Sequence, residues 1–335
     1  MNLRSALFPI SIAPMLDYTD RHYRYFMRQI TKKTILYTEM IVADAIIHGN
    51  HKKLLSYHEL EKPLILQLGG SNPEKLALAT KIAAVYNYDG INLNVGCPSS
   101  RVSSGNFGAC LMQNANLVKE CLQAIQNNSN VPVSIKHRIG LNYNTNYDFL
   151  HDFVNNVSGD NANVCSEFIV HARNAILSGL SPKQNREIPP LNYEYVYRLK
   201  QDFPHLHITI NGGIKNLQQV KEHLQFVDAV MIGREAYSNP YIFCNVDTCH
   251  NNSNDNNKDN KDSQNISSRH QIALNMLHYF SLLRSEQMPL AYVTKHMLGL
   301  FHAHPQAKLW RRTLTIDANK ANFVDIYYNL LQQLQ

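Results

Sequence analysis

Hydrophobic runs with the character of β-strands recur along the first 236 residues of the chain. Several are apolar on both faces, which is typical of a parallel sheet covered by helices. The eight runs are residues 9–15, 34–40, 63–68, 90–95, 131–137, 168–171, 208–211 and 229–233. Because helical patterns lie between many of them, the alternation predicts a (β/α)8 TIM barrel. An open doubly wound α/β sheet would show the same alternation.

The sequence also indicates where two of these helices begin. Ser71 and Glu74 have the spacing of a capping box, with Pro73 in the first turn. Asn114 is placed to cap a second helix, which carries apolar residues at helical spacing over 117–125.

The pattern changes after residue 249. Residues 250–268 are dominated by Asn, Asp, Ser and Lys, which is typical of a flexible linker or loop. Beyond them, apolar stripes at helical spacing predict a small all-helical domain. The expected organisation is a barrel over 1–249, a linker over 250–268 and a helical domain over 269–335.

Composition and charge restrict the function classes. Hydrophobic residues make up 44% of the 335 residues and charged residues 17%, so a sizeable core is expected. The net charge of +6 is compatible with a polyanionic partner. Six cysteines without a CxxC pair argue against a zinc or dithiol site, so no metal is expected. The apolar residues 6–15 are too few to span a bilayer. We expect a soluble, cytoplasmic monomer.

The end of the fourth predicted strand carries the first candidate for chemistry. Apolar residues alternate with Asn92 and Asn94, and the strand stops at Gly96-Cys97-Pro98. In a TIM barrel, functional groups gather at the carboxyl ends of the strands. Cys97, followed by a glycine-containing loop, is therefore a candidate acid or nucleophile. An isolated cysteine is more often a buried structural residue.

The last two predicted strands end in glycine-rich turns. Gly212 and Gly213 are expected to expose backbone N–H groups at the start of a helix, and Gly233 and Arg234 add a second set with a guanidinium. Barrels often bind phosphate at these two loops. The alternative is two ordinary turns with a solvated arginine.

Three polar residues at other strand ends suit a flavin ring. Gln67 offers an amide, Lys136 a cation and His171 an imidazole. A lysine near the ring stabilises negative charge on a reduced flavin, and an amide matches the ring's polar edge. Each residue alone also fits a satisfied polar group, which for His171 is the commoner situation.

Taken together, these segments closely resemble the tRNA-dihydrouridine synthase family, in its A-type subfamily. The segments that carry the resemblance are APMLDYTDRHYR (13–24), LYTEM (36–40), LQLGG (66–70), INLNVGCPS (91–99), GNFGACLM (105–112), IKHRIG (135–140), VHAR (170–173), SPKQNREIPPL (181–191), INGGI (210–214), IGREAY (232–237) and LWRRTL (309–314).

The resemblance implies reduction of the C5=C6 bond of uridine in the D-loop of tRNA, at positions 20 and 20a, by FMN that NADPH reduces. It implies that Cys97 donates a proton to C5 and that Asn94 meets the flipped uracil. The implied FMN contacts are Pro14, Met15, Gln67, Lys136, His171, Asn211, Gly212, Gly213, Gly233 and Arg234. The implied tRNA contacts are Lys183, Arg186, Lys308 and Arg311. The Asn-rich insert is longer than the family requires, and Lys308 stands where the family has an arginine.

Two other functions fit parts of the sequence. A flavin barrel acting on a free pyrimidine would not need the basic C-terminal segment, where seven Lys and Arg face three Asp and Glu from Ile266 onward. A non-catalytic RNA-binding protein would not need the polar strand ends. Release of flavin from the purified protein separates the enzymes from the binding protein.

Overall fold

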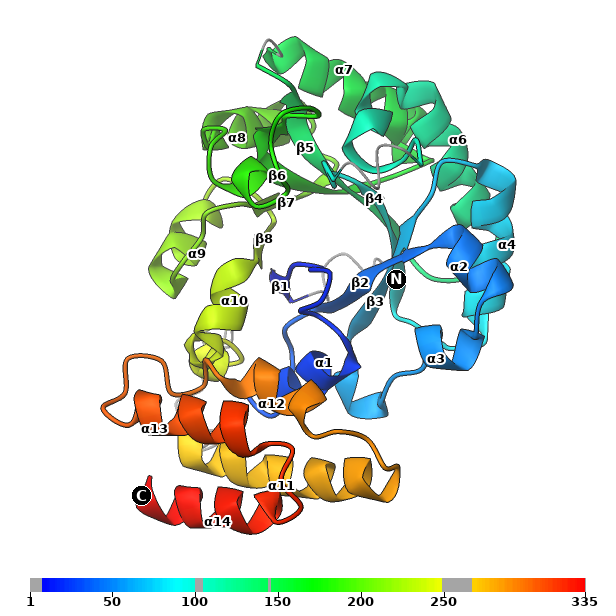
Figure 1. Cartoon of the computed structure of the whole chain (residues 1–335). Coiled ribbons are helices and arrows are strands. Elements are labelled where there is room, and N and C mark those ends of the chain that lie inside the picture. The colour runs from blue at the N-terminus through cyan, green and yellow to red at the C-terminus, as the bar shows by residue number, and fades with distance from the viewer. Residues whose placement is uncertain (1–7, 100–104, 144–145, 249–266, 335) are drawn as a thin grey trace, which may run out of the picture. The chain divides into compact units, whose positions relative to one another are not determined.

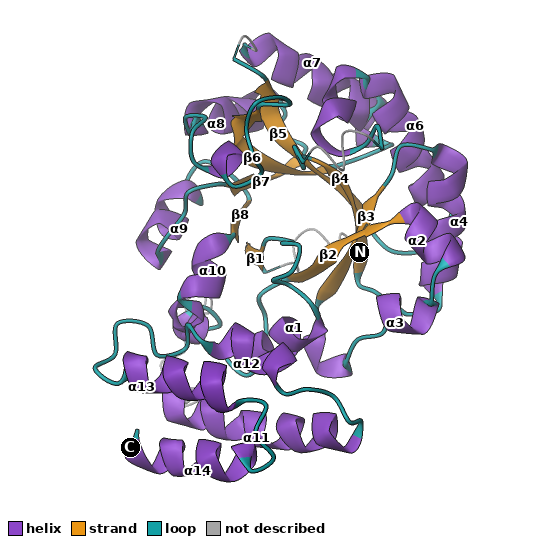
Figure 2. Cartoon of the chain, viewed as in Figure 1, coloured by secondary structure: helices purple, strands orange, loops and turns teal. Residues whose placement is uncertain are grey.

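The computed structural model describes residues 8–99, 105–143, 146–248 and 267–334. All eight predicted strands are present and pair in parallel, in the order β1-β8-β7-β6-β5-β4-β3-β2. Backbone hydrogen bonds between Ile12 and Ile35 (2.9 Å) and between Ile35 and Ile10 (3.1 Å) join β1 to the residue before β2. The ring of strands therefore closes, and the predicted TIM barrel is confirmed over the open sheet (Figure 2). The strands are β1 Ile10–Ile12, β2 Leu36–Val42, β3 Leu64–Gly69, β4 Gly90–Val95, β5 Val133–Leu141, β6 Glu167–Ala175, β7 His207–Asn211 and β8 Ala229–Ile232.

Helices cover the outside of the ring (Figure 1). They are α2 Ala43–His48, α3 His51–Leu55, α4 Pro73–Ala84, α6 Ala115–Gln126, α7 Tyr147–Ser158, α8 Tyr193–Asp202 and α9 Leu217–His223. Alternate strand residues meet inside the barrel, where Tyr37, Ile169 and Met231 are among the members of a buried cluster. This packed interior leaves the carboxyl ends of the strands as the place for polar chemistry.

One predicted helix start is confirmed and the other is wrong. The Asn114 side chain accepts a hydrogen bond from Leu117 N (3.1 Å) and caps α6. At α4 the cap is Asn72, which accepts from Lys75 N (2.8 Å), and not Ser71. Pro73 explains the difference, because proline prefers the first helical position and so makes the preceding residue the cap.

Contacts divide the chain into two compact units. The first is the barrel, which extends to Gly233 without Asp17–Thr34 and His58–Glu61. The second gathers those two segments with Arg234–Gln335. The domain boundaries expected from sequence stay a prediction, and the Asn-rich stretch lies outside the described residues except for Ser267 and Ser268. Among the described residues, no helix is both long and apolar enough to cross a membrane.

The second unit is built from short helices. They are α1 Arg21–Arg28, η2 Glu59–Glu61, α10 Arg234–Ser238, η6 Pro240–Asn245, α11 Arg269–Ser285, α12 Ala291–Met297, α13 Ala307–Arg312, η7 Thr313–Asp317 and α14 Phe323–Gln333. Trp310 is fully buried, donates its Nε1–H to Met297 O (2.9 Å) and packs against Phe301. It therefore packs the helices, as expected of a single tryptophan in an amphipathic segment.

Candidate active site

The backbone turn after β4 presents Cys97. The Asn94 side-chain oxygen accepts hydrogen bonds from Gly96 N (3.2 Å) and Cys97 N (3.1 Å), which fixes the turn. Cys97 O in turn accepts from Ala109 N (2.9 Å). The Cys97 thiol is half-buried and lies 3.6 Å from the Ser99 hydroxyl. A thiol at a strand tip is thus held in place while staying accessible, as a proton donor requires.

A chain of side-chain hydrogen bonds runs from this turn across three strands. Asn94 Nδ2 donates to Gln67 Oε1 (2.9 Å), and Gln67 Nε2 donates to Asn92 Oδ1 (2.7 Å). Asn92 Nδ2 donates to Ser134 Oγ (2.9 Å), and the Ser134 hydroxyl donates to Ile91 O (3.4 Å). All four side chains are buried, so the chain satisfies polar groups that would otherwise be costly.

Lys136 brings a cation to the same end of the barrel. Its Nζ donates to Asn211 Oδ1 (3.1 Å), and Asn211 Nδ2 donates to Met231 O (2.7 Å). Burial, with a smaller contribution from the neighbouring Arg138 cation, lowers the pKa of Lys136 to about 7. The site therefore holds a lysine whose charge is easily changed by a bound partner.

His171 lies in the middle of β6, where it pairs with Asn211, the partner of Lys136. Burial, followed by the cations Arg138 and Lys136, holds the pKa of His171 well below its ordinary range. The imidazole is therefore neutral near pH 7 and has one donor and one acceptor nitrogen. Gly212 (φ 119°) lies against it, since a Cβ on Gly212 would be 2.7 Å from His171 Cδ2. Only glycine fits this position.

The predicted phosphate loops differ in detail from expectation. Gly212 and Gly213 do not start a helix, because α9 begins at Leu217 behind its cap Asn216. The two glycines instead form a turn in which Gly212 O accepts from Tyr193 OH (2.8 Å). At β8, Arg234 opens the short helix α10 directly after Gly233, and phosphate binding at this loop stays a prediction.

The remaining predicted residues fall in several places. Pro14 and Met15 are half-buried directly after β1, and a Cβ on Gly233 would lie 3.8 Å from Ala13 Cβ. Lys183 is exposed and Arg186 half-buried, on either side of Asn185 in η5 (Gln184–Arg186). The exposed Lys308 and Arg311 lie on α13 of the second unit. Their assignments to FMN and tRNA stay predictions.

Sequence reasoning assigned no role to Arg138, a β5 residue that is 3% exposed and whose cation acts on the pKa values of both Lys136 and His171. Its guanidinium donates to three backbone carbonyls, Gly96 O (3.1 Å), Asn185 O (3.1 Å) and Asn174 O (3.4 Å). A signal was present, because residues two apart on a strand share a face, and Arg138 follows Lys136 by two.

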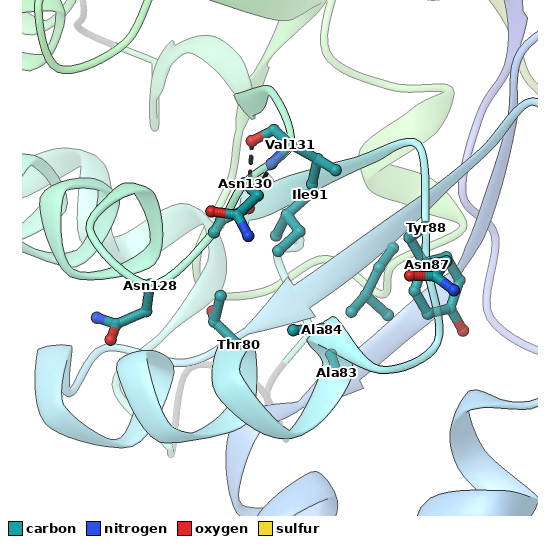
Figure 3. A pocket seen from close by; sticks show the side chains of 11 residues that line it. Thr80, Ala83, Ala84, Asn87, Tyr88, Ile91, Asn128, Asn130 and Val131 are labelled. Atoms are coloured by element: carbon teal, nitrogen blue, oxygen red, sulfur yellow. Dashed lines mark hydrogen bonds between the residues drawn. The ribbon is translucent and has the colours of Figure 1, made fainter.

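A partly open cavity of about 130 Å³ lies elsewhere in the barrel (Figure 3). Its lining includes Thr80 of α4 and residues that precede β4 and β5, such as Tyr88 and Val131. It therefore opens at the amino ends of the strands, where barrels are typically structural.

Comparison with known proteins shows which family and which fold this chain resembles. A family model described as "Dihydrouridine synthase (Dus)" matches residues 11–334. Curated proteins named tRNA-dihydrouridine(20/20a) synthase are 51% identical over 311 residues. That of Synechocystis sp. aligns over 93% of this chain and 90% of its own, and that of Escherichia coli (strain K12) over 93% and 87%. A solved structure of morphinone reductase shares the fold, with a TM-score of 0.50, 11% identity, and coverage of 72% of this chain and 86% of its own.

Proposed function

Because the chain belongs to the dihydrouridine synthase family, we propose that it reduces the C5=C6 bond of uridine to 5,6-dihydrouridine in tRNA. The relatives' name points to positions 20 and 20a of the D-loop. The observation that carries the proposal is the half-buried Cys97 thiol at the tip of β4, beside the buried amides and Lys136.

The residues around this thiol fit a flavin, which we propose is FMN reduced by NADPH. Gln67 Nε2 uses one N–H for Asn92 and has a second for an acceptor on the ring. The half-buried Lys136 has the neutral amide of Asn211 as its partner in the described residues, so an electron-rich ring edge would stabilise its cationic form. The backbone of Gly212, Gly213 and Gly233, with Arg234, would hold the phosphate.

When bound, the flavin supplies the hydride for uridine C6. The chain's own residues supply the rest. Cys97 holds a proton on Sγ for delivery to C5. Asn94 Oδ1 is already occupied by two backbone N–H groups, so its amide offers only an N–H to the substrate. That donor matches a uracil carbonyl oxygen. The neutral His171 adds a hydrogen-bonding group without adding charge.

The substrate must be a flipped nucleotide, because a uracil within a base stack cannot reach a thiol at the barrel end. Lys183 and Arg186, beside the site, and Lys308 and Arg311, in the second unit, are the proposed phosphate contacts of the tRNA. A cytoplasmic location and a monomeric state stay predictions.

The deciding experiment is a map of dihydrouridine in tRNA from cells with and without this protein. Loss of dihydrouridine at positions 20 and 20a alone is the expected result. Purified protein should release FMN on denaturation. If no position loses dihydrouridine, or if the protein holds no flavin after reconstitution, the proposal is wrong.

A further inference from the structure

The peptide group between Gly96 and Cys97 is held at both of its ends. Its carbonyl, Gly96 O, accepts from Arg138 Nε (3.1 Å), while its N–H, on Cys97, donates to Asn94 Oδ1 (3.1 Å). Two side chains from neighbouring strands therefore fix the plane of one peptide. Since the N and Cα atoms of Cys97 belong to that plane, fixing it fixes the backbone point from which the Cys97 side chain projects.

The same guanidinium reaches a second segment. Arg138 Nη1 donates to Asn185 O (3.1 Å), and Asn185 is fully buried in η5 between Lys183 and Arg186. The Asn185 side chain is itself anchored, because its Oδ1 accepts from Ile176 N (2.8 Å) and its Nδ2 donates to Ile176 O (2.9 Å). A shift of η5 is therefore a shift of an acceptor of Arg138.

Charge adds to this role. Burial, at 3% exposure, lowers the pKa of Arg138 to about 10, so the group stays cationic at neutral pH. All three acceptors are backbone carbonyls. A buried arginine that donates to backbone carbonyls of three separate segments holds these segments together, because the planar guanidinium donates in several fixed directions.

We propose that Arg138 is a positioning residue that couples the proposed tRNA-reading segment around η5 to the Cys97 proton donor. This inference rests on the proposed function and assigns no contact between Arg138 and the reacting atoms. Bound tRNA holds η5 in place, η5 holds the guanidinium through Asn185 O, and the guanidinium holds the Cys97 peptide. Proton delivery to C5 then depends on Arg138 through Cys97.

Arg138→Lys is the sharpest test, because lysine keeps the charge but is a single ammonium that does not reproduce the two-directional fork. The matched control is Arg173→Lys. Arg173 is also a buried arginine, and it donates to Glu187 O (3.3 Å) and Pro189 O, both in the loop that carries η5. The substrate is a tRNA transcript free of modification, mixed with enzyme whose flavin has been reduced beforehand.

At saturating tRNA, Arg138→Lys should lower the single-turnover rate of dihydrouridine formation by about tenfold to hundredfold, the scale of a small misplacement of a reacting group. Flavin content and the rate of flavin reduction by NADPH should match wild type. Arg173→Lys should change the tRNA concentration that gives half the maximal rate. Its single-turnover rate at saturating tRNA should stay within about twofold of wild type.

A double variant separates positioning from general damage. In a Cys97→Ala background, adding Arg138→Lys should lower the single-turnover rate by less than about twofold, because Arg138 contributes through Cys97. A full additional loss there would overturn the proposal, as would an Arg138→Lys enzyme that behaves like Arg173→Lys. If neither Arg138→Lys nor Arg138→Gln folds with bound flavin, Arg138 is a structural residue and the proposal is wrong. A wild-type enzyme that forms no dihydrouridine refutes the proposed function instead.

Discussion

Glu61→Gln should destabilise the second unit strongly, although it replaces only an oxygen by an NH₂ group. Glu61 is 1% exposed, and both of its carboxylate oxygens accept hydrogen bonds, Oε2 from Arg24 Nε (2.6 Å) and Oε1 from His58 N (2.7 Å). A glutamine has one acceptor oxygen, so its NH₂ must face one of the two donors. Arg24, 4% exposed, also loses its charged partner.

The magnitude follows from those two losses. A hydrogen bond to a charged group contributes about 1.5–3 kcal/mol. Removing one partner of a buried ion pair costs about 3–5 kcal/mol in total. Because the glutamine keeps one acceptor, we expect about 3 kcal/mol, or a melting temperature lower by roughly 6–12 °C at about 2–4 °C per kcal/mol.

The assay is thermal and denaturant unfolding followed by circular dichroism, with Glu59→Gln as the matched control. Glu59 lies in the same turn, η2, and is exposed, so its neutralisation should change stability by less than about 0.5 kcal/mol. The opposite result is that the two variants have free energies of unfolding within about 0.5 kcal/mol of each other, a difference as small as that of a surface ion pair. In that case the Arg24–Glu61 pair does not stabilise the unit and the reasoning is wrong.

Three other predictions concern the barrel and its tRNA contacts. Cys97→Ala should keep bound flavin and lower uridine reduction by about two to four decades, whereas Cys110→Ala should not; equal losses measured in one assay would contradict the assignment of the proton donor. The folded pKa of Lys136, about 7, lies below the value of about 10.4 for an unfolded lysine, so the folded state binds fewer protons between them. The flavin-free protein should therefore gain stability as pH rises from 7 to about 10, and Lys136→Met should remove this gain in denaturant titrations across that range. Arg186→Ala with Arg311→Ala should weaken tRNA binding and reduce its salt-dependence slope by about one unit per residue at most; unchanged affinity and slope would exclude these contacts.

The barrel could be predicted because most of its strands are short apolar runs that alternate with helical patterns, a signal that is local in the sequence. Strands β5 and β6 nevertheless run to Leu141 and Ala175, well beyond the apolar runs that predict them. Their extensions mix polar and apolar residues and pair across an irregularity between Arg138 and Gly140. Because the apolar run stops where polar residues begin, the sequence did not predict how far these strands extend. The ends of the strands nearest the proposed chemistry were therefore the hardest part of the sheet to predict.

Contacts distant in sequence explain the rest. Nothing local indicates that Asp17–Thr34 joins the C-terminal helices, because this depends on pairs such as His22 Nδ1 with Tyr279 OH (2.9 Å). The role of Arg138 has the same origin, since its acceptors Gly96 and Asn185 lie 42 and 47 residues away. Strand-end position and then a family resemblance pointed to Cys97 and Lys136, but neither describes what holds these two side chains.

The chain of side-chain hydrogen bonds from Asn94 through Gln67 and Asn92 to Ser134 has a fixed donor-to-acceptor direction. At one end, the N–H groups of Gly96 and Cys97 can only donate to Asn94 Oδ1. At the other end, Ile91 O can only accept from Ser134. Every hydrogen bond between these ends must therefore run in the same donor-to-acceptor direction. Asn92→Asp would put an acceptor where an NH₂ group now faces Ser134, and the serine hydroxyl would have to turn away from Ile91 O to answer it. Ser134 lies on β5, one strand away from the thiol. The orientation of the Asn94 amide at the Cys97 turn nevertheless depends on both ends of this hydrogen-bond chain, the turn itself and Ser134 with Ile91 O.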